Sequence, residues 1–376
     1  MNNRKRIGIK FEYNDQWIGG TYYFLNLIQV LKRLDVQNQP MVVIFSKISD
    51  YTYILQQTSY QFLEFVDLDK KEISFLQKIA NRFFYIFSNR VLFKKKYKGE
   101  IDVLLLMKWN DYFSKVSKQK LVYWIPDFQH KYFPEFYSAQ GLSKIENNIL
   151  WISKYAKKVI FSSADALNDW KNYYPKYNGI NQILKFAVTH PEFESLDTNE
   201  VKRKHQIDNE YIMVPNHFWQ HKNHFIVILA AEHLKKLGKS KLFVLCGKEN
   251  DDRNPDYVIN LKNYVNKNNL DDVVKFLGFI DRREQLKLMS ESEAILQPSK
   301  FEGWSTVIED AMRMNKVIIA SDLSVNREQL GLNGIYFKMD DYLDLSDKVI
   351  NLDTKTIDFN YNMKMNDFLE GIMKLF

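Results

Sequence analysis

Two series of short apolar segments, each alternating with helical patterns, constrain the fold of this chain more than any other feature. Segments this short and this rich in Val, Ile, Leu and Phe are typical of parallel strands that helices cover on both faces of a sheet. The first series contains RIGIKF (6–11), PMVVIF (40–45), QFLEFVDL (61–68), IDVLLLM (101–107), KLVYWIP (120–126) and KKVIFSS (157–163). The second series contains YIMVPN (211–216), KLFVLCG (241–247), VVKFLGF (273–279), EAILQPS (293–299), KVIIASD (316–322) and GIYFK (334–338).

The two series predict an α/β protein with two doubly wound domains. A length of 376 residues also favours two domains of ordinary size. The polar stretch 189–210 separates the series and is the natural linker. A helix is predicted after the first strand. Its apolar residues lie on one face by helical spacing, and they are Phe24, Leu27 or Ile28, Leu31 and Leu34.

Composition narrows the class of protein further. The single cysteine, Cys246, excludes an intramolecular disulfide framework and fits a reducing compartment. The apolar run near the basic N-terminus is too short for a signal peptide, and no run of about 18 apolar residues occurs in the sequence. We therefore expect a soluble, cytoplasmic protein.

Positive charge is concentrated in one segment. The formal net charge is +7, and residues 73–99 hold many Lys and Arg and no acid, together with several aromatic residues at helical spacing. Such a helix can lie on an anionic membrane surface, which would place the protein at the inner face of the cell membrane. A helix that buries its aromatic face in the core explains the pattern equally well. Nucleic acid is a weaker interpretation, because no nucleic-acid module accompanies the cluster.

The loops after the strands are where a doubly wound fold binds ligands. The first such loop carries Gly19-Gly20 before a helix, where backbone can approach a phosphate closely. The pattern is not GxGxxG, which argues against a dinucleotide site. A simple turn is the commoner meaning of two glycines at such a place.

The loop VPNHFWQHKNHF (214–225) opens the second series. His217, His221 and His224 resemble a metal cluster, but no HExxH pattern or nearby Cys or Asp accompanies them, so we expect no metal. Lys222 can neutralise a diphosphate together with the dipole of the following helix. The alternative interpretation of Lys222 is a solvated lysine on the protein surface.

The loop after 120–126 contains Asp127 and His130. Either residue can face the cleft between the domains and orient or deprotonate a hydroxyl. The alternative is that Asp127 caps a turn after Pro126 and that His130 packs among aromatic residues.

The stretch FEGWSTVIEDAM (301–312) places three carboxylates around a predicted helix start. Thr306 and Glu309 fit the capping-box pattern T-x-x-E, which predicts a structural role for Glu309. The backbone amides of 305–307 would form an anion site at the helix N-terminus. Glu302 and Asp310 would flank that site and accept hydrogen bonds from sugar or ribose hydroxyls.

Together these motifs resemble the retaining glycosyltransferases of family four, among the glycosyl transferases group 1. PSKFEGWSTVIEDAM matches their P-S-x-x-E-G-x-x-x-x-x-x-E-A signature, and HKNH, GGTYYFLNL and FLGFIDRREQL match in the same order along the chain. The resemblance implies a GT-B fold. It further implies an acceptor-binding domain at 1–190, a nucleotide-sugar domain at 191–354, and a final helix at 355–376 that packs back on the first domain.

The resemblance also implies roles for individual residues. Glu302 matches the glutamate that contacts the transferred sugar, Asp310 the acid that holds the ribose, and Lys222 the lysine on the diphosphate. Gly20 matches the glycine-loop contact. The remaining donor contacts that we expect are Gly19, Asn216, His217, Gly247, Gly278, Phe279, Gly303, Ser305, Thr306 and Val307.

Two departures from the family pattern matter. Family members usually carry an arginine five or six residues before the lysine, where this chain has His217 or Asn216. Many members also have His-Asp where this chain has Pro126-Asp127, so His130 is a candidate substitute for the missing histidine.

The sequence therefore predicts a retaining, metal-independent transferase without a cofactor. It would move sugar from a nucleotide sugar to a glycan or lipid-linked acceptor, in bacterial surface polysaccharide synthesis. Two alternatives share the fold, and the first is a nucleotide-sugar epimerase, which would convert its substrate without an acceptor. The second is a non-catalytic nucleotide-binding partner.

Overall fold

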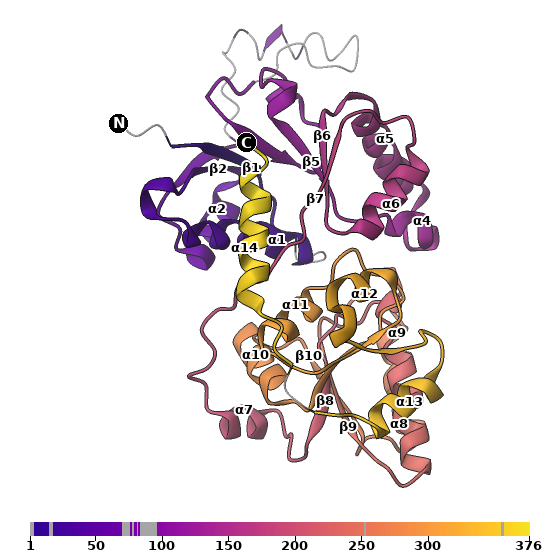
Figure 1. Cartoon of the computed structure of the whole chain (residues 1–376). Coiled ribbons are helices and arrows are strands. Elements are labelled where there is room, and N and C mark those ends of the chain that lie inside the picture. Colours follow the sequence, from indigo (N-terminus) through magenta and orange to yellow (C-terminus); the bar gives the residue numbers. More distant parts are fainter. Residues whose placement is uncertain are drawn as a thin grey trace.

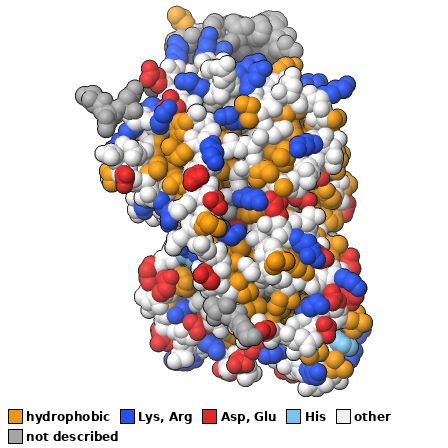
Figure 2. Space-filling model, viewed as in Figure 1, with side chains coloured by type: hydrophobic (Ala, Val, Ile, Leu, Met, Phe, Trp, Pro, Cys, Tyr) orange, Lys and Arg blue, Asp and Glu red, His pale blue; other side chains and the backbone are white. Residues whose placement is uncertain are grey.

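The computed structural model describes residues 4–14, 18–69, 76, 79–80, 82, 96–251, 253–354 and 357–376. Within these residues, none of the helices combines the length and apolar character needed to cross a membrane. Most of the basic segment 73–99 lies outside the described residues, so the membrane-surface hypothesis for it stays a prediction. On the face shown in Figure 2, Lys and Arg side chains are interspersed with Asp and Glu over both halves of the molecule.

The first half of the chain forms a parallel seven-stranded sheet in the order β3-β2-β1-β4-β5-β6-β7. Its strands are β1 (Arg6–Lys10), β2 (Met41–Ser46), β3 (Leu63–Asp67), β4 (Val103–Leu106), β5 (Leu121–Ile125), β6 (Lys158–Phe161) and β7 (Ile180–Ile183). The α-helices are α1 (Ile18–Val30), α2 (Ile48–Thr58), α4 (Gln129–Tyr132), α5 (Ala139–Tyr155) and α6 (Ala164–Tyr173). Short 3-10 turns are η1 (Leu31–Arg33), η2 (Val36–Asn38), η3 (Asp111–Phe113), η4 (Lys118–Lys120) and η5 (Pro134–Phe136).

The second half forms a parallel six-stranded sheet in the order β10-β9-β8-β11-β12-β13. Its strands are β8 (Tyr211–Val214), β9 (Leu242–Cys246), β10 (Val274–Gly278), β11 (Ala294–Gln297), β12 (Ile318–Ser321) and β13 (Ile335–Phe337). Its helices are α7 (Thr198–Lys204), α8 (His224–Lys236), α9 (Tyr257–Lys267), α10 (Arg282–Glu291), α11 (Thr306–Arg313), α12 (Ser324–Leu330) and α13 (Tyr342–Ile350), with 3-10 turns η6 (Gln220–Lys222) and η7 (Gly331–Asn333).

The predicted fold class, two doubly wound Rossmann-like domains, is confirmed. Every segment of the two predicted series contains a strand, and the central strands are buried because helices cover both faces. The helix predicted after the first strand also forms, with Phe24, Leu27, Ile28 and Leu31 buried. One strand, β7, was not predicted, because its residues INQI include two amides and lie at the sheet edge.

The chain crosses between the halves twice (Figure 1). After β7 it leads through the stretch around 189–197 to the second sheet, and at the end it returns as α14 (Tyr361–Met373). This last helix packs against α1. Lys158 donates a hydrogen bond to the carbonyl of Leu375 at 2.8 Å, and Gln182 donates one to that of Gly371 at 3.0 Å.

The strand order determines where a ligand site can form. In each sheet the chain reverses its direction of winding, between β1 and β4 in the first sheet and between β8 and β11 in the second. Loops that diverge at such a switch point leave a crevice beyond the carboxyl ends of the strands. The loops after β1, β5, β8 and β11 therefore become the walls of one site.

Candidate functional site

A cavity of about 410 Å³ lies between the two halves. From the first half it is lined by Tyr13, Ile18, Gly19, Tyr22, Tyr53, Trp124, Pro126, Asp127, Gln129, Ser162 and Phe186. From the second half it is lined by Pro215, Asn216, His217, Trp219, His221, Lys222, Cys246, Gly247, Lys248, Phe279, Ile280, Asp281, Arg282, Gln285, Phe301, Glu302, Gly303, Trp304, Ser305, Thr306, Val307 and Asp310. Most residues that the sequence singled out thus meet around one cavity.

Lys222 and Glu302 form an ion pair on the wall of the cavity that the second half contributes, called here the second wall. The Lys222 Nζ lies 2.5 Å from Oε1 of Glu302, and Gln297 donates a second hydrogen bond to the same oxygen at 2.6 Å. Lys222 ends η6 after β8 and Glu302 follows β11, and these two strands are neighbours in the sheet. The pairing of β8 with β11 therefore brings together two residues that are eighty positions apart in the sequence.

The N-terminus of α11 opens into the same cavity. Ser305 is its N-cap residue and accepts a hydrogen bond from the amide of Ile308 at 3.2 Å. Thr306 and Val307, in the first turn, both line the cavity. Amides of a first turn have no helical partner, so this end of α11 can bind an anion beside Lys222.

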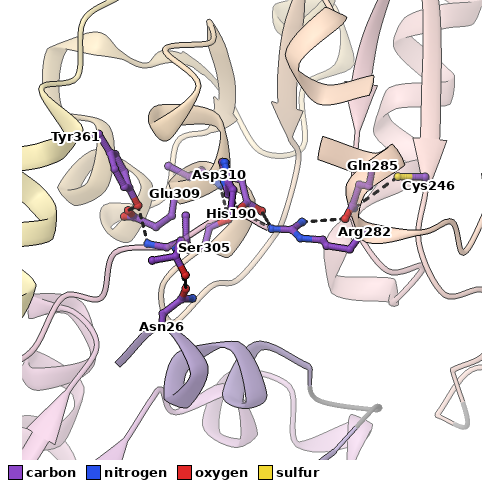
Figure 3. Close-up of polar contacts among 12 residues, drawn as sticks. Asn26, His190, Cys246, Arg282, Gln285, Ser305, Glu309, Asp310 and Tyr361 are labelled. Atoms are coloured by element: carbon purple, nitrogen blue, oxygen red, sulfur yellow. Dashed lines mark hydrogen bonds and ion pairs between the residues drawn. The ribbon is translucent and has the colours of Figure 1, made fainter. Parts of the chain in front are cut away.

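Asp310 also lines the cavity, and it is held from two sides (Figure 3). The Arg282 Nη2 lies 2.6 and 2.7 Å from its two carboxylate oxygens, and His190 Nε2 lies 3.1 Å from Oδ1. Burial favours a higher pKa for Asp310, but the Arg282 and His190 side chains outweigh it and lower that pKa. Asp310 is therefore an ionised acceptor, and Arg282 is the single partner of its Oδ2 within the described part of the chain.

The capping-box prediction for Glu309 is wrong. The amide of the N-cap residue Ser305 donates instead to Gln329 at 2.9 Å. Glu309 is buried and turned away from that amide, and it accepts hydrogen bonds from Gln329 at 3.0 Å and from the Tyr361 hydroxyl at 2.6 Å (Figure 3). Burial raises the pKa of Glu309. Its structural role is to bind the C-terminal helix α14, which begins at Tyr361, to α11.

Asp127 faces the second half across the cavity at very short range. A Cβ added to Gly303 would lie 2.8 Å from the Asp127 Cβ and 2.8 Å from the Pro126 carbonyl oxygen, so only glycine fits. The Asp127 Oδ1 accepts a hydrogen bond from the backbone amide of Gln129 at 2.9 Å. Burial raises the pKa of Asp127, and the nearby Glu302 charge acts in the same direction. A carboxylate with a raised pKa accepts a proton more readily.

Three of the expected site residues lie outside the cavity. His130 is buried, with its Nε2 3.3 Å from a Glu146 carboxylate oxygen and its ring against Phe128. Gly20 is buried within α1, while its neighbour Gly19 lines the cavity. Gly278 ends β10 at a φ of +66°, and the cavity contact comes from the following residue, Phe279.

Two of the three histidines after β8 are held by different partners. His217 accepts a hydrogen bond from the Lys248 amide at 3.0 Å, while His224 stacks on Phe218 with the ring centroids 4.5 Å apart. Burial lowers the pKa of His217 to about 4 and that of His224 to about 3, so both rings are neutral at pH 7. Among the described residues, no group of three His, Cys, Asp or Glu side chains is placed to hold a metal ion.

Two cations of the cavity were not anticipated from the sequence. Lys248 follows β9, and Arg282 begins α10 after β10. With Lys222 they line the second wall, which therefore suits an anionic ligand. FLGFIDRREQL was noted as a match to the family, but only the structure shows that its first arginine faces Asp310.

Comparison with known proteins agrees with this geometry. The family model of the glycosyl transferases group 1 matches residues 197–365, which span the whole second wall. This stretch of the chain is therefore similar to the glycosyl transferases group 1. Of the curated proteins, the O-antigen chain mannosyltransferase RfbU of Salmonella typhimurium is 28% identical over 151 residues, and the aligned stretch covers 40% of this chain and 40% of that protein.

Solved structures extend the likeness to the fold of the whole chain. A glycosyltransferase from Rickettsia africae superposes with a TM-score of 0.67 at 14% identity, covering 99% of this chain and 98% of that one. Anabaena Alr3699/HepE in complex with UDP superposes with a TM-score of 0.60 at 14% identity, covering 99% and 95%. The residues that match the group 1 model thus lie mainly in the second half of a GT-B fold.

Proposed function

We propose that the protein is a glycosyltransferase that moves a sugar from a nucleoside-diphosphate sugar to an acceptor hydroxyl. The observation that carries the proposal is the Lys222–Glu302 pair beside the N-terminus of α11 in the cavity between the halves. A cation and free helix amides suit the diphosphate, and a carboxylate beside them suits the sugar hydroxyls. The group 1 match and the UDP bound to Alr3699/HepE support a nucleotide-sugar donor.

In the proposed reaction the bond between the anomeric carbon and the phosphate oxygen breaks, and the acceptor oxygen forms a new bond to that carbon. Negative charge then develops on the departing diphosphate. Lys222 and the amides at the start of α11 would stabilise this charge, with Lys248 and Arg282 on the same wall and with no metal required. The acceptor proton passes to Asp127, whose pKa burial raises. Retention at the anomeric carbon is the part of the proposal that rests on the family resemblance.

The donor contacts follow from the same geometry. Glu302 would hold the transferred sugar, and Asp310 would accept one ribose hydroxyl through Oδ2. Phe279, at the mouth of the cavity, is 69% exposed and would lie near the base. Contact of the two halves around the donor would exclude water and protect it from hydrolysis.

We further propose that the acceptor belongs to bacterial surface polysaccharide synthesis in the cytoplasm. The support is the relative RfbU, an O-antigen chain mannosyltransferase. Residues 73–99 would attach the protein to the inner face of the membrane through their Lys and Arg side chains. Binding to anionic liposomes at low salt, lost when these basic residues are replaced by Gln, would support the attachment.

The central experiment combines donor binding with transfer. A thermal-shift screen of nucleoside diphosphates identifies the donor base, because a ligand that binds only the folded state raises the melting temperature. Transfer is then measured from the matching nucleotide sugars. We expect Lys222→Ala and Glu302→Ala to lower kcat by about 100-fold to 1000-fold, whereas Lys239→Ala, at an exposed position outside the cavity, leaves it unchanged.

Other outcomes would point elsewhere. Wild-type rates in both cavity variants would contradict the assignment of Lys222 and Glu302. Conversion of a nucleotide sugar without any acceptor would instead indicate an epimerase, and nucleotide binding without any turnover a non-catalytic partner. The variant Lys222→Arg is a control for folding, because it keeps a cation beside the largely buried Glu302 carboxylate and does not leave that carboxylate unpaired.

A further inference from the structure

Aromatic rings from the two halves meet beside the cavity. In the first half, Phe133 and Phe136 stack with their ring centroids 5.0 Å apart. Across the contact, Phe133 lies 6.3 Å from the ring of Phe301, and Phe136 lies 6.0 Å from the ring of His221. Tyr132 adds a second contact to Phe301 at 5.1 Å. Rings at these separations attract one another, and the five are called here the aromatic clasp.

A cation extends the contact between the halves toward the cavity. The Arg253 guanidinium carbon lies 5.4 Å from the ring centroid of Phe136 and 5.0 Å from that of Trp219 in the second half. Asp251 fixes the guanidinium through two hydrogen bonds, of 2.7 and 3.0 Å. Because Trp219 lines the cavity, the contact reaches the wall of the site.

In the second half, the clasp residues are the immediate neighbours of the ion pair in the cavity. His221 directly precedes Lys222, and Phe301 directly precedes Glu302. The Lys300 amide donates a hydrogen bond to the His221 carbonyl at 2.7 Å, which ties the two segments through their backbones. Together with the ion pair, this bond makes the two segments one unit.

In the first half, a series of hydrogen bonds connects the clasp to Asp127. The backbone amide of Phe136 donates to the Phe133 carbonyl at 3.1 Å, and the Phe133 amide donates to the Gln129 carbonyl at 2.9 Å. The Gln129 amide in turn donates to the Asp127 carboxylate at 2.9 Å. The loop after β5 is thus a second unit, which carries both the clasp rings and the carboxylate that would take the acceptor proton.

We propose that Phe133 and Phe136 are positioning residues for sugar transfer. They set the place of Asp127 relative to the Lys222–Glu302 pair. This role rests on the proposed function, in which the proton leaves toward one half while charge develops on a diphosphate held by the other. Among the described residues, the lining of the cavity includes neither phenylalanine, so both act through the groups that they align. A misplacement of about 1 Å at such groups can cost about 100-fold in rate.

Donor binding should depend little on the clasp. Lys222, Asp310 and the N-terminus of α11 all belong to the second half, and the ion pair with Glu302 holds Lys222 there without the rings. Loss of a clasp ring should therefore lower kcat, which needs groups from both halves, and leave nucleotide affinity nearly unchanged. A residue that only stabilised the donor site would affect both quantities.

The first test measures transfer and donor binding in ring variants of the full chain. Phe133→Ala and Phe136→Ala should each lower kcat about tenfold to 100-fold. The affinity for UDP or GDP, whichever binds the wild type more tightly, should change by less than about twofold. Phe133→Tyr and Phe136→Tyr keep the rings and should recover most of the rate. Tyr155→Ala is the control, because it removes an exposed ring of the same half outside the cavity lining.

A double-mutant cycle separates positioning from a general weakening of the fold. In an Asp127→Asn background, Phe136→Ala should lower kcat by less than about a further twofold, because the group that the ring positions is already absent. An effect on folding would be the same in both backgrounds. An equal loss in both backgrounds, wild-type kcat in both Ala variants, or a loss confined to nucleotide affinity would each overturn the proposal.

Hydrogen exchange tests the clasp without any turnover. Phe136→Ala should speed exchange in peptides that span 126–137 and also in those that span 219–223 and 298–303, since loss of the contact loosens both sides. Faster exchange confined to the first half would show that the rings do not hold the second half, and the proposal would fail. Faster exchange on both sides, in a protein that turns over no nucleotide sugar, would leave the contact in place and contradict the proposed function instead.

Discussion

At the scale of single residues, the adjacent acids Glu309 and Asp310 show how one helical turn separates two roles. A turn of helix directs neighbouring side chains about 100° apart, so one carboxylate enters the core and the other reaches the cavity. Glu309 binds Tyr361 and Gln329, while Asp310 pairs with Arg282 and lines the cavity. Asp310 lines the cavity as predicted, whereas Glu309 binds Gln329 and Tyr361 in place of the predicted N-cap amide.

This separation leads to a prediction for nucleotide binding. We expect Asp310→Asn to weaken the best-bound nucleoside diphosphate about tenfold, because a charge-assisted hydrogen bond to the ribose is lost. Glu309→Gln should change that affinity by less than about twofold, since its partners Tyr361 and Gln329 lie outside the cavity lining. Isothermal titration calorimetry of both variants measures the effect. The opposite ranking of the two variants would show that the roles are reversed.

At the scale of elements, every strand except the edge strand β7 was predictable, and the loop contacts were not. Apolar runs locate buried parallel strands to within one or two residues because burial on both faces demands them. The motif residues Lys222 and Glu302 were found because each follows such a strand. Arg282 and Tyr53 were missed because their place at the cavity depends on which strands and helices become neighbours, and local sequence does not encode that. Glu309 was misassigned because Gln329, far along the chain, reaches the N-cap amide first.

The loop after β11 provides a prediction at this scale. Gly303→Ala should lower the melting temperature by several degrees, because its Cβ would overlap Asp127 and Pro126 and overpacking costs about 1–3 kcal/mol. Gly19→Ala is the matched control, since a Cβ there meets no atom of the described residues within 4 Å. Differential scanning calorimetry compares the two. Equal melting temperatures for wild type and Gly303→Ala would mean that the halves do not approach as closely in solution.

At the scale of the whole molecule, α11 is linked to both crossings between the halves. Asp310 contacts His190 in the first crossing, and Glu309 contacts Tyr361 at the start of α14 in the second. The Tyr361 hydroxyl also accepts a hydrogen bond from the Val188 amide at 2.8 Å, which joins the two crossings to each other. The helix whose N-terminus faces the proposed diphosphate is therefore held by the segments about which the halves would move.

A separate contact holds the halves together away from these crossings. Glu328 on α12 accepts hydrogen bonds from the Ala164 amide at 2.9 and 3.0 Å and pairs with Lys185 at 2.8 Å. Its carboxylate thus binds the N-terminus of α6 in the other half, where a negative charge is favoured. Ser163 caps the same helix locally, by accepting a hydrogen bond from the Ala166 amide at 3.0 Å.

Two backbone amides at the N-terminus of α6 therefore report on two different contacts. The Ala164 amide reports on Glu328 in the second half, and the Ala166 amide reports on the local cap Ser163. Glu328→Ala should speed hydrogen exchange at Ala164 about fivefold or more, the equivalent of a lost cap of about 1 kcal/mol, because that amide loses its partner from the other half. Ala166 should exchange as in the wild type, since Ser163 still binds it, and Lys185→Ala should leave both amides protected. Exchange followed by NMR on protein labelled with 15N-alanine resolves the two sites. If Ala164 stayed protected without the Glu328 carboxylate, α12 would not be what holds α6 against the second half, and the crossings alone would set how the halves approach.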